Sequence, residues 1–102
     1  MQNYSIAICD DDAMTRRELL GQCRDILTEL NIPNEITLYT SASKLDSAIN
    51  DRKFDLLILD IQMDGMTGMD LAHRLRKNND RISIIFISSC DEYLREGYEV
   101  QP

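Results

Sequence analysis

Aspartates stand directly after two short apolar runs of the sequence. Asp10 and Asp11 follow residues 5–9, and Asp60 follows residues 54–59. Carboxylates that are crowded together raise one another's pKa unless a cation neutralises them. Mg²⁺ suits such a group because it prefers oxygen ligands, keeps several waters and needs only one or two carboxylates besides a phosphate. If the three side chains converge, they predict a metal-assisted phosphoryl-transfer site.

The elements around these aspartates alternate between predicted strands and predicted helices. The strands are residues 5–9, 35–39, 54–59 and 82–87, and the helices are residues 13–30, 42–50, 69–77 and a last one starting near residue 91. Strands separated by helices indicate parallel crossovers and a sheet that is covered on both faces. Ligands of such sheets bind at the carboxyl ends of the strands. Adjacent strands lie about 4.8 Å apart, so aspartates that follow two neighbouring strands can share one ion.

The first predicted helix shows an apolar stripe. Leu19, Cys23, Ile26 and Leu30 recur at steps of three and four, and Asp12 stands where an N-cap residue belongs. The stripe predicts which side of the helix packs on the sheet.

A structural role is the competing interpretation for each acid. A single aspartate after a strand is more often a turn or cap residue than a ligand. That interpretation fits Asp12 and Asp64. Three acids gathered at the ligand-binding edge are harder to explain by capping, so we interpret Asp10, Asp11 and Asp60 as a site.

Length, charge and cysteine content narrow the class of protein. The 102 residues predict one domain, and the formal net charge of −7 disfavours binding to nucleic acid or anionic membranes. We interpret Arg16 and Arg17 as part of a solvated helix face. The three cysteines form no C-x-x-C pair, which favours a reducing compartment. The first residues do not resemble a signal peptide, and no apolar run approaches the roughly 20 residues of a membrane span. We therefore predict a cytoplasmic protein.

Three segments, taken together, resemble the response-regulator receiver domain of the CheY-like kind. They read Ile-Ala-Ile-Cys-Asp10-Asp11-Asp12, Leu-Leu-Ile-Leu-Asp60-Ile-Gln-Met-Asp-Gly-Met-Thr-Gly68 and Ile-Ile-Phe-Ile-Ser88. The resemblance covers the whole chain and implies an α/β, flavodoxin-like, doubly wound parallel sheet with strand order 2-1-3-4. The segment Asp60-Ile-Gln-Met and the last residues, 91–102, resemble the subgroup attached to LytTR-type DNA-binding domains.

The resemblance also implies a role for each site residue. Asp60 would take a phosphoryl group from the phosphohistidine of a sensor histidine kinase. Asp11, Asp60 and the backbone carbonyl of Gln62 would bind Mg²⁺ directly, and Asp10 would hold the ion through water. Ser88 would donate its hydroxyl to the phosphoryl group. The domain would switch an output domain, and it would not be a turnover enzyme.

The end of the sequence departs from the family. Receiver domains continue with a fifth strand, a lysine that contacts the phosphoryl oxygens, and a fifth helix, whereas this sequence stops at Pro102. We therefore expect residues 1–102 to be one receiver domain that lacks the fifth strand and helix. The fourth strand would then be an exposed apolar edge, which favours self-association.

Three other hypotheses about the class of protein stay open at this point. An aspartate phosphatase of the haloacid-dehalogenase kind shows Asp-x-Asp-x-Thr/Val, but Met14 occupies the last of these positions. A flavin-binding module would need a phosphate-binding loop after the first strand, where three aspartates stand instead. A receiver-like interaction module that is never phosphorylated is the third. His73 is the single histidine, and its helix pattern predicts an outward-facing surface residue.

Overall fold

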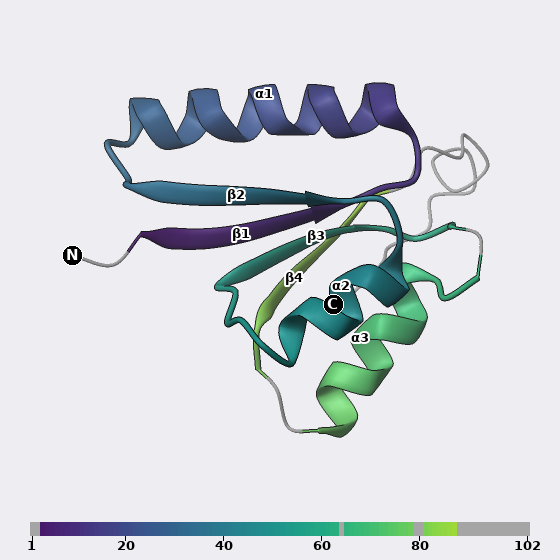
Figure 1. The fold of residues 1–102 in the computed structure, drawn as a ribbon. Helices are drawn as coiled ribbons and strands as arrows, with labels where there is room; N and C mark the ends of the chain where they lie inside the picture. Colours follow the sequence, from purple (N-terminus) through teal and green to yellow (C-terminus); the bar gives the residue numbers. More distant parts are fainter. Residues whose placement is uncertain (1–2, 64, 79–80, 88–102) are drawn as a thin grey trace, which may run out of the picture.

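The chain forms a parallel sheet with helices on both sides (Figure 1). The structure is a computed structural model, and it describes residues 3–63, 65–78 and 81–87. The strands are β1 (Tyr4–Cys9), β2 (Asn34–Tyr39), β3 (Leu56–Asp60) and β4 (Ser83–Ile87), and the helices are α1 (Ala13–Glu29), α2 (Ala42–Ile49) and α3 (Gly68–Lys77). The strands lie in the order β2-β1-β3-β4, and all three pairings are parallel. The predicted doubly wound α/β fold with strand order 2-1-3-4 is confirmed.

Helix α1 covers one face of the sheet, and α2 and α3 cover the other (Figure 1). Successive side chains of a strand point to opposite faces. Ile6 and Ile8 of β1 therefore pack with Leu27 of α1, whereas Ala7 and Cys9 pack with the buried residues of α2 and α3. A strand that is buried on both faces reads as a nearly continuous apolar run, which explains why the sequence pattern revealed β1 and β3.

The buried stripe of α1 differs from the predicted one. Leu19 and Cys23 pack against the core as predicted, but Ile26 and Leu30 are 55% and 62% exposed. Leu27 is only 8% exposed and takes the place expected of Ile26. Two overlapping apolar stripes run along α1, and the one that contains Leu27 packs against the sheet. Leu30 lies outside the stripe because α1 ends at Glu29 and Leu30 is its C-cap.

Capping side chains fix the first turns of the helices. Asp12 accepts a hydrogen bond from the Thr15 amide at 2.9 Å, and Ser41 caps α2 in the same way. At α3, Thr67 and Asp70 form a reciprocal capping box, with bonds of 3.0 and 3.1 Å. Each such cap stabilises a helix by about 1 kcal/mol. Because α1 and α3 follow β1 and β3, their caps also fix the loops at the carboxyl ends of these strands.

Strand β4 lies at the edge of the sheet within the described part of the chain. Ile84 is buried and Ile85 is 48% exposed, so part of this edge is apolar and accessible. Self-association through it stays a prediction. The predicted helix from residue 91 lies outside the described residues, and the expectation that the fifth strand and helix are missing stays an expectation.

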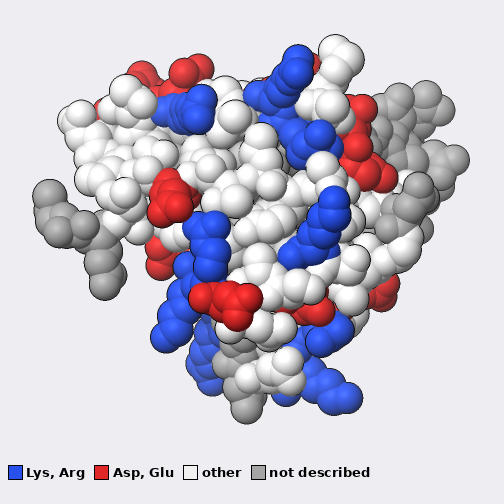
Figure 2. Space-filling model, in the orientation of Figure 1, with Lys and Arg blue, Asp and Glu red and all other residues white. Residues whose placement is uncertain are grey.

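Surface features bear on the predicted partners. On the face in Figure 2, basic and acidic side chains are interspersed, and several basic side chains gather toward its lower edge. Among the residues that the structure places, no helix is long and apolar enough to cross a membrane. His73 is exposed, as predicted.

Candidate metal centre

Three aspartates meet at the carboxyl ends of β1 and β3. The two strands are neighbours, and Cys9 pairs with Leu59, so the residues that follow these two lie side by side. One carboxylate oxygen from each of Asp10, Asp11 and Asp60 lies within 4.8 Å of the other two. The structure therefore brings together the three acids that the sequence pattern singled out.

Asp10 and Asp60 are buried, whereas Asp11 is exposed. Asp10 Oδ1 accepts a hydrogen bond from the Asp12 amide at 2.8 Å. Asp10 Oδ2 is buried without a hydrogen-bond partner among the described residues. An unpaired buried carboxylate oxygen is costly, and a cation, or a water held by a cation, removes this cost. The donor set, three carboxylates with one unsatisfied oxygen, fits a hard divalent cation such as Mg²⁺.

Burial disfavours the charged forms of both buried acids. Burial raises the pKa of Asp10 above its usual range. Burial, followed by the negative charge of Asp10, raises the pKa of Asp60 to about 6. The Gln62 amide, which donates to Asp60 Oδ1 at 3.3 Å, only partly offsets this rise. A cation bound between these carboxylates would favour their charged forms and displace protons from them.

The loop after Asp60 is held close to the sheet by two contacts. The Cys9 thiol donates to Met63 Sδ at 3.7 Å, and both side chains are buried. Burial raises the pKa of Cys9 to about 12, so the thiol stays protonated and can donate. Gly68 lies against the backbone carbonyl of Asp60, where a Cβ atom would collide with the oxygen. These contacts fix the backbone of Gln62, whose carbonyl is a candidate metal ligand.

Arg16 is a contact residue that the sequence pattern missed. Its Nη1 donates to the backbone carbonyl of Asp10 at 2.7 Å, and the side chain is half-buried. The interpretation of Arg16 as part of a solvated face is therefore wrong, although Arg17 is exposed as expected. The available signal was spacing: Arg16 stands four residues after the cap Asp12, so it projects from the first turn on the same side of the helix.

The remaining predicted site residues are placed differently. Gln62 is exposed, and its backbone amide donates to Asp60 Oδ1. Ser88 lies outside the described residues, so its predicted contact with the phosphoryl group stays a prediction. The same holds for Asp64 as a loop residue.

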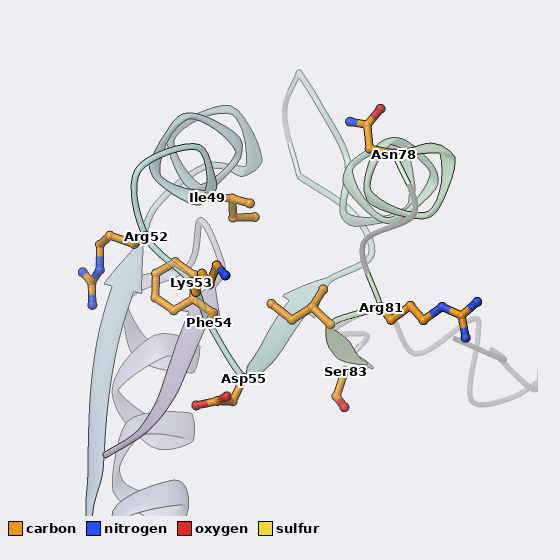
Figure 3. Close-up of a pocket in the computed structure, with 9 residues that line it drawn as sticks. Ile49, Arg52, Lys53, Phe54, Asp55, Asn78, Arg81 and Ser83 are labelled. Atoms are coloured by element: carbon orange, nitrogen blue, oxygen red, sulfur yellow. The ribbon is translucent and has the colours of Figure 1, made fainter. Parts of the chain in front are cut away.

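A hollow lies at the opposite ends of the strands, where β3 and β4 begin (Figure 3). It has a volume of about 600 Å³ and is bordered by the apolar residues Ile49, Phe54 and Ile82. Figure 3 shows Arg52 and Arg81 extending away from the space on its two sides. Arg52 instead stacks over the Phe54 ring at 4.8 Å. The hollow is separate from the acidic cluster.

Fold and site together define a class: a doubly wound α/β domain with an acidic cluster at the carboxyl ends of its two central strands. The chain matches the family described as "Response regulator receiver domain" over residues 6–101. It belongs to this family, and it is a receiver domain of a two-component response regulator, which is a class of signalling domain. The match favours this reading over the aspartate phosphatase and the flavin module.

The chain is also similar in sequence to curated response-regulator proteins. The chain is similar to the sensory transduction protein LytT of Bacillus subtilis, with 34% identity over 98 residues, which are 93% of this chain and 38% of LytT. An uncharacterized response regulatory protein of Vibrio cholerae is 29% identical over 99 residues, 96% of this chain and 36% of that protein. The chain thus spans little more than a third of the length of either relative. The likeness to LytT supports the predicted LytTR-type subgroup.

Solved structures agree on the fold. A receiver domain of Francisella response regulator 1452 superposes with a TM-score of 0.73 at 22% identity, covering 93% of this chain and 75% of that one. The response regulator TrrA from Thermotoga maritima, solved in complex with Mg(2+)-BeF, gives a TM-score of 0.74 at 24% identity, covering 90% of this chain and 75% of that one. At these identities the likeness concerns the fold alone.

Proposed function

We propose that Asp60 is the phosphoryl acceptor of this receiver domain and that Mg²⁺ binds beside it. The observation that carries the proposal is the convergence of three carboxylates within 4.8 Å, with Asp60 buried at the end of a central strand. Asp11, Asp60 and the Gln62 carbonyl would hold the ion directly, and Asp10 would hold it through water.

The proposed chemistry is the transfer of a phosphoryl group from a phosphohistidine to Asp60. An Asp60 carboxylate oxygen forms a bond to phosphorus while the nitrogen–phosphorus bond of a phosphohistidine breaks, and the electron pair stays on the imidazole. Bound Mg²⁺ supplies charge neutralisation for the phosphoryl oxygens next to the acids. Asp60 is anchored on a strand, so its direction of approach is set before the donor arrives. Ser88 donates a hydroxyl hydrogen bond to the transferred group.

The partners follow from the same proposal. The phosphoryl donor is a sensor histidine kinase, and the domain switches a LytTR-type DNA-binding output domain. The support is the family match and the likeness to LytT, whose sequence is more than twice as long as the matched part. We place the protein in the cytoplasm, where such a kinase would present its phosphohistidine.

Acetyl phosphate tests the acceptor without the kinase. The chain is incubated with acetyl phosphate and Mg²⁺, and its intact mass is recorded beside Asp60→Asn and Asp25→Asn. Asp25 is an exposed acid on α1, so its variant controls for loss of one negative charge. We expect one phosphoryl adduct on the wild type and on Asp25→Asn, and none on Asp60→Asn. An adduct that persists in Asp60→Asn would show that another residue is the acceptor.

A further inference from the structure

A long side chain from the first turn of α1, that of Arg16, reaches back to the loop that carries Asp10 and Asp11. Arg16 Nη1 donates to the Asp10 carbonyl at 2.7 Å, a bond that spans six positions of the chain. This carbonyl belongs to the peptide that joins Asp10 to Asp11. Holding it fixes the plane of this peptide. The bond from the Asp12 amide to Asp10 Oδ1 holds the next peptide, so the Asp11 side chain leaves a backbone that is restrained on both sides.

The surrounding contacts show why this bond matters for Asp11 in particular. Asp10 has its own anchors, because its amide donates to the Tyr39 carbonyl at 3.2 Å and its Oδ1 accepts from the Asp12 amide. Asp11 is exposed, and within the described residues no hydrogen bond to its carboxylate is formed. The orientation of Asp11 toward Asp60 thus depends on its backbone.

We propose that Arg16 is a positioning residue for the metal site, which holds the Asp10–Asp11 peptide so that the Asp11 carboxylate faces Asp60. The inference rests on the proposed Mg²⁺ site and adds a residue that does not itself bind the ion. A guanidinium suits this role because it stays charged and forms short, directional hydrogen bonds to a carbonyl oxygen.

The proposal predicts that removing Arg16 lowers the affinity for Mg²⁺, whereas a simple charge effect predicts that it raises this affinity. A positive charge near the site repels Mg²⁺. If Arg16 acted only through its charge, it would weaken Mg²⁺ binding, and its removal would tighten this binding. If Arg16 instead orients the Asp11 carboxylate, it strengthens Mg²⁺ binding, and its removal weakens Mg²⁺ binding. Loss of a residue that orients a metal ligand commonly lowers metal affinity about 10- to 100-fold.

Calorimetric titration of the chain with MgCl₂ separates the two effects, using Arg16→Gln, Arg16→Lys and the matched control Arg17→Gln. Arg17 carries the same charge on the next residue of α1, but it is exposed. We expect Kd for Mg²⁺ to rise roughly tenfold in Arg16→Gln and about threefold in Arg16→Lys, which keeps the charge but loses the planar fork. Arg17→Gln should stay within about twofold of the wild type, because its charge is screened by solvent.

The amide NMR spectrum of the metal-free protein gives a second readout. Loss of the hydrogen bond to the Asp10 carbonyl should shift the Asp11 amide nitrogen in Arg16→Gln and leave it unchanged in Arg17→Gln. Equal or tighter Mg²⁺ binding by Arg16→Gln would overturn the inference. If Arg16→Gln does not fold, a wild-type Kd in Arg16→Lys would overturn it. A wild-type chain that binds no Mg²⁺ would instead overturn the proposed function, and the inference with it.

Discussion

At the scale of residues, the central fact is that Asp60 is buried beside another buried acid. Its pKa of about 6 lies above the usual 3.8, because burial and the charge of Asp10 both disfavour the carboxylate. Between these two pH values the folded state binds more protons than the unfolded state does. The metal-free protein therefore loses stability as the pH rises from about 4 through about 6.

Asp60→Asn should remove this penalty. In metal-free buffer at pH 7 we expect the variant to be more stable than the wild type by up to about 3 kcal/mol, and the difference to shrink at pH 4.5. Urea unfolding at the two pH values measures it. Asp25→Asn is the control and should differ from the wild type by less than about 0.5 kcal/mol. An Asp60→Asn variant that is less stable than the wild type at pH 7 would refute the account of the acid cluster.

Gly68 supplies the second prediction at this scale. Gly68→Ala places a Cβ atom against the Asp60 carbonyl, so the loop or the strand end must move. We expect a loss of about 1–3 kcal/mol in stability, typical of overpacking, together with weaker Mg²⁺ binding. Gly21→Ala is the matched control, because Gly21 lies in α1 with open space around its Cβ position. It should stabilise the protein by up to about 1 kcal/mol, and equal effects of the two variants would contradict the packing argument.

At the scale of elements, the sequence pattern predicted most of what the structure shows. Continuous apolar runs revealed β1 and β3, because each is buried on both faces. The convergence of Asp10 with Asp60 followed from the strand order 2-1-3-4, which the resemblance to receiver domains implied. Contacts made by single side chains could not be predicted in this way: Arg16 and Met63 act through their reach and rotamers, which hydrophobic periodicity does not encode.

The α1 stripe shows the same limit and can be tested. Ile26 and Leu27 are adjacent in sequence, yet Leu27 is 8% exposed and Ile26 is 55% exposed. Leu27→Ala should cost about 2–5 kcal/mol of unfolding free energy, because it leaves a cavity between α1 and the sheet. Ile26→Ala should cost less than about 1 kcal/mol. Urea unfolding of both variants measures these losses. A larger loss of unfolding free energy for Ile26→Ala than for Leu27→Ala would show that the stripe predicted from the sequence is the buried one.

At the scale of the whole molecule, metal binding and folding are linked. A ligand that binds only the folded state stabilises it by RT ln(1 + [L]/Kd), which is about 2.7 kcal/mol at one hundred times Kd. Saturating MgCl₂ should therefore raise Tm of the wild type. The same addition should raise the Tm of Asp11→Asn only by the amount that its ionic strength accounts for.

Matched ionic strength is the necessary control for this experiment. The chain carries a net charge of −7, so any salt screens its self-repulsion. NaCl at the same ionic strength should raise Tm of the wild type and of Asp11→Asn equally. A Mg²⁺ effect no larger than that of NaCl would show that the acidic cluster does not bind the ion specifically.

The central claim is that Asp60 carries the phosphoryl group, and the site of modification tests it most directly. The chain is treated with acetyl phosphate and Mg²⁺, the acyl phosphate is reduced with borohydride to homoserine, and the digested protein is sequenced by mass spectrometry. The account predicts homoserine at position 60 and none at positions 10 or 11. Homoserine at position 10 or 11, or at none of the three in a protein that has gained a phosphoryl group, would contradict it.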